Sequence, residues 1–255
     1  MSQARMAISA SLLVAASCVR FGSSTDPTPA SPDTLDASAR DGDASLIDAG
    51  GPGCPATSIF CDDFEGYVAD AGLAGTKWSA LPGAGVGSID AALAFSPSHS
   101  LKIEVPVGKT ERTVGVSVRP KIGSSGITLH AAMHISAAPA YAQLISMVID
   151  GRFFAVVCEN GTFVAQYQDA AKPTSYVRTD TLIPIGRWFQ LAYELKFGPL
   201  GGVRLSIDGE SIYSSKAETT GTATVTSFEL LVQPNLGSVT TTAPMTFNYD
   251  DVRLE

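Results

Sequence analysis

Residues 186–213, GRWFQLAYELKFGPLGGVRLSIDGESIY, contain two alternating segments joined by a Gly-Pro-rich turn. Between 188 and 197 every second residue is large and apolar, and the segment 203–207 continues this period of two. Such a period is typical of a strand with one face against a core. Asp208-Gly209 supplies the positive φ values of a two-residue hairpin. The stretch therefore predicts two strands folded back on each other, followed by a second tight turn.

The composition fits one large β-rich domain. The 255 residues are 45% hydrophobic and 16% charged, and 24 glycines with 15 prolines mark many turns. The net charge of −8 argues against a nucleic-acid partner, because proteins that bind phosphate backbones present clustered Lys and Arg.

The N-terminus has the pattern of an export signal. Residues 1–17 hold a short apolar run, too short to span a bilayer permanently. Ala15-Ala16-Ser17-Cys18 resembles the lipobox of bacterial lipoproteins, which implies a lipid on Cys18 and attachment to a membrane surface. Val19 is not the Asp associated with inner-membrane retention, so the outer membrane or cell surface is expected. The alternative is ordinary secretion.

Residues 18–53 are predicted to form a disordered tether. They are rich in Ser, Pro, Ala, Asp and Gly, and they carry too few large apolar side chains to offset the entropy of ordering. Beyond them, Cys54 and Cys61 are close in sequence, and export favours a disulfide between them. Cys158 lies in an apolar segment and is expected to be a small buried hydrophobe.

Residues 54–255 are predicted to fold as an all-β, two-sheet antiparallel jelly-roll sandwich. Short alternating segments recur to the end of the chain, without a helix-length amphipathic segment. The predicted strands are Ile59–Glu65, Ile89–Phe95, Ser100–Val105, Thr113–Arg119, Thr128–Ile135, Gln143–Ile149, Arg152–Glu159, Thr162–Gln168, Trp188–Phe197, Val203–Ile207, Val225–Gln233 and Met245–Leu254.

Several motifs resemble known jelly rolls. The order Trp, strand, turn, strand, Asp-Gly in 188–209 resembles laminin-G-like and concanavalin A-like domains. CDDFEG at 61–66 followed by Trp78, and FNYDDVRLE at 247–255, are similar to the opening and closing strands of laminarinase-type glucanases. SPSHSLKIEV at 96–105 is similar to a strand of sugar-binding relatives. The resemblance implies the fold only, because this superfold hosts lectins, hydrolases, lyases and non-enzymatic modules.

A candidate sugar groove follows from two tight turns. Asp150-Gly151 and Asn160-Gly161 pair Ile149 with Arg152 and Glu159 with Thr162, which sorts three strands into an apolar face and a more polar one that includes Leu144. Amides, hydroxyls, a cation and an aromatic plane are what a sugar site needs. The candidate ligand-binding residues are Arg119, His130, His134, Ser146, Phe153, Gln166 and Gln168. The alternative is a solvated sheet face.

Enzymatic motifs are weak. The glucanase pattern E-x-D-x-x-E, which sets two carboxylates across a glycosidic bond, does not occur. The alginate-lyase-like relatives use Arg, Gln-x-His and Tyr strands. Here Arg119, His134 and either Tyr141 or Tyr167 offer the residue types without the motifs. His130 and His134 stand about 13 Å apart along a strand, too far to share a zinc ion.

The glucanase resemblance also implies a structural calcium ion, although no cofactor is expected to be required. The ion would be bound through the Asp of the closing strand, here Asp250, with carboxylates from Asp62, Asp63 and Glu65 near the opening strand. The alternative is a solvated acidic sheet edge.

Three functions remain open from the sequence. The first is a non-catalytic, lectin-like domain that binds extracellular or cell-wall polysaccharide from a surface anchor. The second is a divergent polysaccharide lyase or glycoside hydrolase, and the third is an adhesion module without a sugar site. A lectin requires an exposed aromatic side chain beside amides, whereas an enzyme requires closely set titrating groups.

Overall fold

The computed structural model describes residues 54–55, 57–73, 76–80, 86–108, 116–118, 126–167, 175–197, 201–215, 227–237 and 241–255. The predicted signal peptide (1–17), Cys18, the tether (18–53), Arg119 and Gln168 lie outside the described residues. None of the described segments forms a helix long and apolar enough to cross a membrane.

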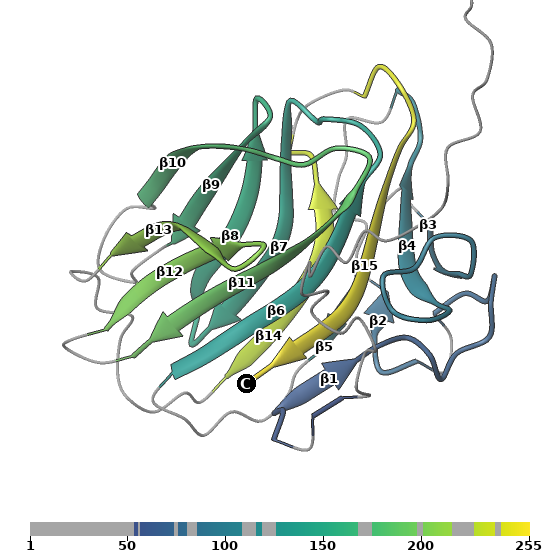
Figure 1. Ribbon diagram of the computed structural model, residues 1–255, viewed down its shortest axis with the longest axis horizontal. Coiled ribbons are helices and arrows are strands. Elements are labelled where there is room, and N and C mark those ends of the chain that lie inside the picture. Colours follow the sequence, from purple (N-terminus) through teal and green to yellow (C-terminus); the bar gives the residue numbers. More distant parts are fainter. Residues whose placement is uncertain are drawn as a thin grey trace, which may run out of the picture. The chain divides into compact units, whose positions relative to one another are not determined.

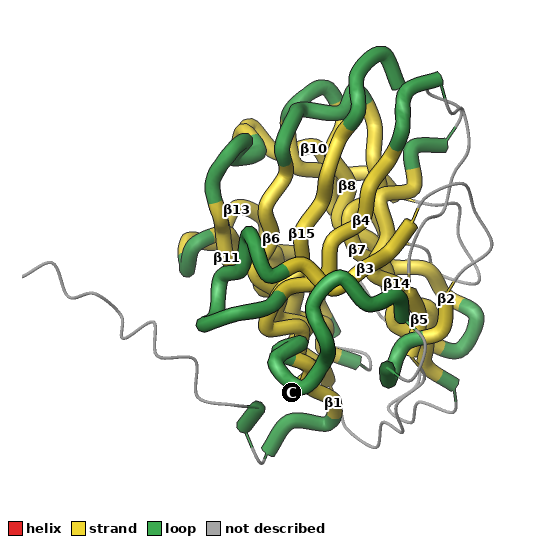
Figure 2. Tube along the Cα trace, turned by 90° about the vertical axis from the view of Figure 1, so that its right-hand side faces the viewer, coloured by secondary structure: helices red, strands yellow, loops and turns green. Residues whose placement is uncertain are grey.

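The described strands form two antiparallel sheets, as predicted, which lie one behind the other in Figure 1. Sheet A has the order β13-β12-β11-β6-β15-β4-β3, with β1 also paired to β15, and Figure 2 shows β6, β15, β4 and β3 side by side. Its strands are β1 (Phe60–Asp62), β3 (Val86–Asp90), β4 (Ser100–Val105), β6 (Gly126–Ile135), β11 (Trp188–Lys196), β12 (Gly202–Ile207), β13 (Glu210–Ser215) and β15 (Met245–Leu254).

Sheet B has the order β10-β9-β8-β7-β14-β5-β2. Its strands are β2 (Ser79–Ala80), β5 (Val116–Val118), β7 (Tyr141–Ile149), β8 (Arg152–Glu159), β9 (Thr162–Tyr167), β10 (Ser175–Leu182) and β14 (Phe228–Asn235). Three of the fifteen described strands, β2, β10 and β13, were not predicted from the sequence. The predicted strand Ile89–Phe95 is wrong for most of its length, because β3 ends at Asp90 and residues 91–99 form a loop.

The three predicted tight turns occur where the sequence places them. Asp150-Gly151, Asn160-Gly161 and Asp208-Gly209 all have positive φ at both positions. The strands that flank the first two turns have the predicted registers, with Ile149 opposite Arg152 and Glu159 opposite Thr162. These turns therefore fix which residues of β7, β8 and β9 share a face.

A bulge in β7 interrupts the alternation that the sequence predicts. Gln143 pairs with Val157 and Ile145 with Val156, so Leu144 is an extra residue on its strand. Leu144 and Ile145 both join the apolar core between the sheets, and the expected outward position of Leu144 is wrong. The hydroxyl of the buried Tyr249 on β15 donates to the carbonyl of Leu144 (2.8 Å), which connects the two sheets at the bulge.

Cys54 and Cys61 form the predicted disulfide, and Cys158 is free and buried, also as predicted. Burial raises the pKa of the Cys158 thiol to about 11, so this side chain serves packing and is a poor nucleophile. The disulfide ties Cys54 to Cys61, which lies in β1 and pairs with Arg253 of β15.

We expect removal of this disulfide by the double substitution Cys54→Ala and Cys61→Ala to lower the free energy of unfolding by about 2–3 kcal/mol, the loop-closure entropy of a loop this short. Urea unfolding under oxidising conditions measures the loss. The reducing agent dithiothreitol should destabilise the wild type by a similar amount and leave the double variant unchanged. Equal stability of the oxidised wild type, the reduced wild type and the double variant would show that the disulfide does not stabilise the fold.

Candidate functional site

Sheet B carries polar side chains on the face turned away from the core. The inward residues of β8 and β9 belong to the core cluster, and the alternate positions place Glu159, Gln166 and Phe153 on the outer face. Ser146 of β7 lies on this face too and is 1% exposed. The structure therefore brings together three of the predicted ligand-binding residues, Ser146, Phe153 and Gln166.

Three amide side chains form a hydrogen-bonded row across this outer face. Asn235 Nδ2 donates to Gln143 Oε1 (3.3 Å), and Gln143 Nε2 donates to Gln166 Oε1 (3.4 Å). Gln166 Nε2 in turn donates to the hydroxyl of Tyr176 (3.2 Å). We call Asn235, Gln143 and Gln166 the amide row. It runs across the sheet from β14 through β7 and β9 to the phenol of β10, on a diagonal to the strands, because Gln143 lies opposite Val157 and Gln166 opposite Ala155.

A groove of about 380 Å³ lies beside the amide row. Its volume is within the range of about 300–1,000 Å³ that is usual for ligand sites. Tyr176 stands at the edge strand with 57% of its surface exposed, so its ring is available for stacking. The groove is lined by Tyr141, Val157, Glu159, Val164, Tyr176 and Arg178.

The floor of the groove is apolar. Ala155, Val157 and Val164 form a small buried cluster on the outer face, and Tyr141 and Phe153 pack against it while partly exposed. An apolar floor between polar walls suits a sugar ring, whose C–H faces are apolar and whose edges carry hydroxyls. Phe153 thus lies in this cluster and supports the groove.

The charged groups of the groove are paired with each other. Arg178 donates to both carboxylate oxygens of Glu159, from Nε (2.8 Å) and from Nη2 (2.9 Å). The hydrogen bond from Arg178 lowers the pKa of Glu159, which keeps this carboxylate ionised. Burial raises the pKa of Tyr141, so its phenol holds its proton at neutral pH.

The prediction that one groove holds all the candidate ligand-binding residues is wrong, because His130 and His134 lie on the other sheet. Both residues are on β6 of sheet A, whose alternate residues Leu129, Ala131 and Met133 point into the core. Their side chains therefore occupy the outer face of the opposite sheet, because the sandwich separates the two outer faces. Sequence alternation assigns a face to each residue but does not say which sheet its strand joins.

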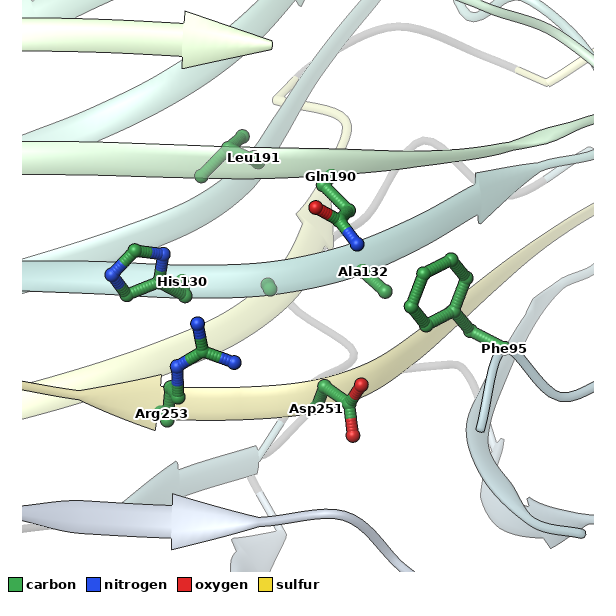
Figure 3. A pocket seen from close by; sticks show the side chains of 8 residues that line it. Phe95, His130, Ala132, Gln190, Leu191, Asp251 and Arg253 are labelled. Carbon is green, nitrogen blue, oxygen red and sulfur yellow. The ribbon is translucent and has the colours of Figure 1, made fainter. Parts of the chain in front are cut away.

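A small hollow of about 60 Å³ surrounds His130. Figure 3 shows His130 and Arg253 at one end, with Gln190, Phe95 and Asp251 toward the other. Arg253 Nε is engaged by Glu255 (3.0 Å), which also approaches His130 Nε2 (3.6 Å). Burial lowers the pKa of His130. The hollow has room for no more than a few waters and is a weaker candidate than the groove.

The predicted calcium ligands act as hydrogen-bond acceptors for the chain itself. Asp62 is 3% exposed and accepts from Phe64 N (3.1 Å), the Tyr67 hydroxyl (2.7 Å) and Trp78 Nε1 (2.9 Å). Asp63 accepts from Glu65 N (3.3 Å). These bonds explain the opening motif and its Trp, because the buried carboxylate of Asp62 holds the indole in place.

Asp250 and Glu65 hold the loop of residues 91–99 over the outer face of sheet A. Asp250 is fully buried and accepts from the N–H groups of Phe95 and Ser96 (2.9 Å each) and from the Ser96 hydroxyl (3.0 Å). Glu65 accepts from the N–H groups of Ser98 and His99 (3.0 Å each) and from the Ser98 hydroxyl.

The fit of these acidic residues to a calcium ion is poor as they stand. Within the described part of the chain, no three His, Cys, Asp or Glu side chains are grouped so that they could hold a metal ion. Their oxygens already accept N–H and O–H donors, which a bound cation would have to displace. The calcium site stays a prediction.

Asp250 and Glu65, which hold the loop of residues 91–99, predict opposite changes of stability with pH. Burial raises the pKa of Asp250 to about 6, so the folded state binds a proton that the unfolded state lacks between pH 6 and 4. Stability from this group should therefore rise by about 1 kcal/mol as the pH falls from 7 to 5. Burial alone would raise the pKa of Glu65, but hydrogen bonds from Ser98 and His99 lower it to about 2, so its contribution is lost below pH 4.5.

Urea unfolding of the wild type and of Asp250→Asn across pH 4–7 measures this effect, because their difference cancels His130 and other titrating groups. The difference should change by about 1 kcal/mol between pH 7 and 5. A pH-independent difference would show that Asp250 has an ordinary pKa.

Several residues in or beside the groove were not predicted from the sequence. Tyr176 and Arg178 lie on β10, which was not predicted, and Asn235 extends β14 beyond its predicted end. Tyr141 was considered only for a lyase, and Gln143 was not considered for the groove. The alternation of SYVRTDTL at 175–182 was the available signal, but its inward residues are small or polar and only half-buried.

Comparison with known proteins supports the fold. No protein-family model and no curated protein sequence match the chain. An endo-β-1,4-glucuronan lyase from the fungus Trichoderma reesei is similar in structure, with a TM-score of 0.59, 16% identity and coverage of 78% of this chain and 95% of its own. The cellulose-induced protein Cip1 has a TM-score of 0.56, 14% identity and coverage of 77% and 96%.

The binding domain of botulinum neurotoxin serotype D/C is also similar, with a TM-score of 0.53 and 11% identity over 77% of this chain and 48% of its own. The likeness to these three structures agrees with the two-sheet jelly-roll sandwich described above. At such low identities the likeness shows the fold alone.

Proposed function

We propose that the protein binds polysaccharide without cleaving it, through the groove on the outer face of sheet B. The observation that carries this proposal is the exposed ring of Tyr176 beside the amide row. Stacking on the ring would hold the C–H face of a sugar, and the half-buried amides of Gln143 and Asn235 would match its hydroxyls. A surface anchor through a lipid on Cys18 is part of the proposal and rests on the sequence alone.

The chemistry of the groove favours binding over cleavage. Glycoside hydrolysis usually needs two carboxylates flanking the bond, and Glu159 is the single one among the described lining residues. A lyase needs a base, but burial raises the pKa of Tyr141, and the three described histidines, His99, His130 and His134, do not line the groove. The similarity to a glucuronan lyase keeps a divergent lyase as the second candidate.

A glycan array probed with the full chain tests the proposal. Bound glycans would then be incubated with the protein, and the products analysed for new reducing ends and for absorbance at 235 nm, which reports lyase products. We expect binding without either product. New reducing ends would establish an enzyme, and a folded sample that binds no glycan would leave an adhesion module.

A further inference from the structure

Arg178 is the one cationic side chain among the described residues that line the groove, and it forms an ion pair with Glu159. Both carboxylate oxygens accept from the guanidinium, in the bidentate geometry that gives the strongest pairing of these two groups. An anionic ligand that needed Arg178 would have to displace Glu159 or lie beside it. The guanidinium is therefore a poor receptor for a second carboxylate.

The remaining charges on this side of sheet B are acidic in the part of the chain that the structure describes. Asp180 is exposed two residues beyond Arg178 on β10 and lies on the same face. With Glu159 balanced by Arg178, Asp180 adds a negative charge beside the ion pair. A negative charge at this position disfavours polyanions and leaves neutral chains unaffected.

We infer that the polysaccharide bound in the groove is uncharged, which deepens the proposed function and rests on it. The groove offers phenols, a stacking ring and an apolar floor, with the amide row beside it, all of which suit hydroxyls and C–H faces. A uronate carboxylate would have to compete with Glu159 for the one cation that lines the described groove, so its charge would lack a partner of its own. The same arrangement rejects acidic chains while it binds neutral ones.

Matched pairs of oligosaccharides test this inference with the full chain. Each pair has one linkage and chain length and differs at C6, where one member carries a hydroxymethyl group and the other a carboxylate; cellohexaose and its glucuronan counterpart are one pair. In the pair that the protein binds, we expect the affinity for the neutral member to be at least about tenfold higher than that for the acidic member, as one charged group without a partner implies. Binding of the neutral member should be independent of salt between about 0.05 and 0.5 M.

Two variants isolate the ion pair. Glu159→Gln releases the guanidinium of Arg178. It should raise the affinity for the acidic member about tenfold and change the affinity for the neutral member little. Glu194→Gln makes the same charge change on sheet A, where Glu194 pairs with Lys196 (3.0 Å), and should leave both affinities unchanged. If the wild type binds the acidic member as tightly as the neutral one, the inference is overturned. Failure to bind any member of any pair would instead refute the proposed function.

Discussion

The substitution Tyr176→Ala is expected to weaken glycan binding about thirtyfold, or about 2 kcal/mol, which is the usual effect of truncating a central aromatic contact. The ring is 57% exposed on the edge strand β10, so little packing is lost with it. Isothermal titration with the glycan found on the array measures the change, and thermal unfolding should differ little from the wild type.

Two further variants separate the ring from its hydroxyl and from the strand. Tyr176→Phe keeps the stacking surface and removes the hydroxyl that accepts from Gln166, so a loss of only a few-fold is expected. Leu182→Ala changes another exposed side chain of β10, 72% exposed, and should leave the affinity unchanged. If Tyr176→Ala binds like the wild type, the sugar does not lie in this groove.

The substitution Asp250→Ala is expected to lower the free energy of unfolding by about 3 kcal/mol at pH 7. The change leaves the N–H groups of Phe95, Ser96 and Asp251 without their acceptor, and an unsatisfied buried N–H costs about 1–3 kcal/mol. Relief of the buried charge offsets part of this loss. Urea unfolding gives the stability, and hydrogen exchange should show faster exchange in residues 91–99.

Asp63→Ala is the matched control, because Asp63 accepts a single longer bond from Glu65 N (3.3 Å) near the same loop. Its effect should stay below about 1 kcal/mol. If Asp250→Ala lowers the free energy of unfolding by less than about 1 kcal/mol, another contact holds the loop over sheet A.

Much of the fold could be predicted because its signals are local. The three Asp-Gly and Asn-Gly turns specify both the hairpins and their registers, since only a few residue types tolerate positive φ at both positions. The closeness of Cys54 and Cys61 in sequence likewise indicated their pairing. β4, β8 and β15 have the predicted bounds. Apolar residues alternate along β4, two tight turns bound β8, and apolar residues recur along β15 on both sides of its register shift.

The site was harder to predict because it depends on long-range pairing. Nothing near His130 says that β6 joins β11 and β15 rather than the strands of sheet B. The bulge at Leu144 depends on packing against the other sheet, where Tyr249 bonds its carbonyl. Tyr176 lies on an edge strand with half-buried inner residues, and such a strand lacks the apolar stripe that identifies the others.

The position of β15 in sheet A has a consequence for how the chain acquires its structure during synthesis. β15 follows the other described strands in sequence, yet it lies between β6 and β4 and also pairs with β1. While the ribosome is still making residues 245–254, those three strands have no partner at this position. Sheet A can therefore be completed only after these residues have emerged. Nascent chains should stay sensitive to protease and to aggregation until then, as is usual for folds dominated by distant contacts.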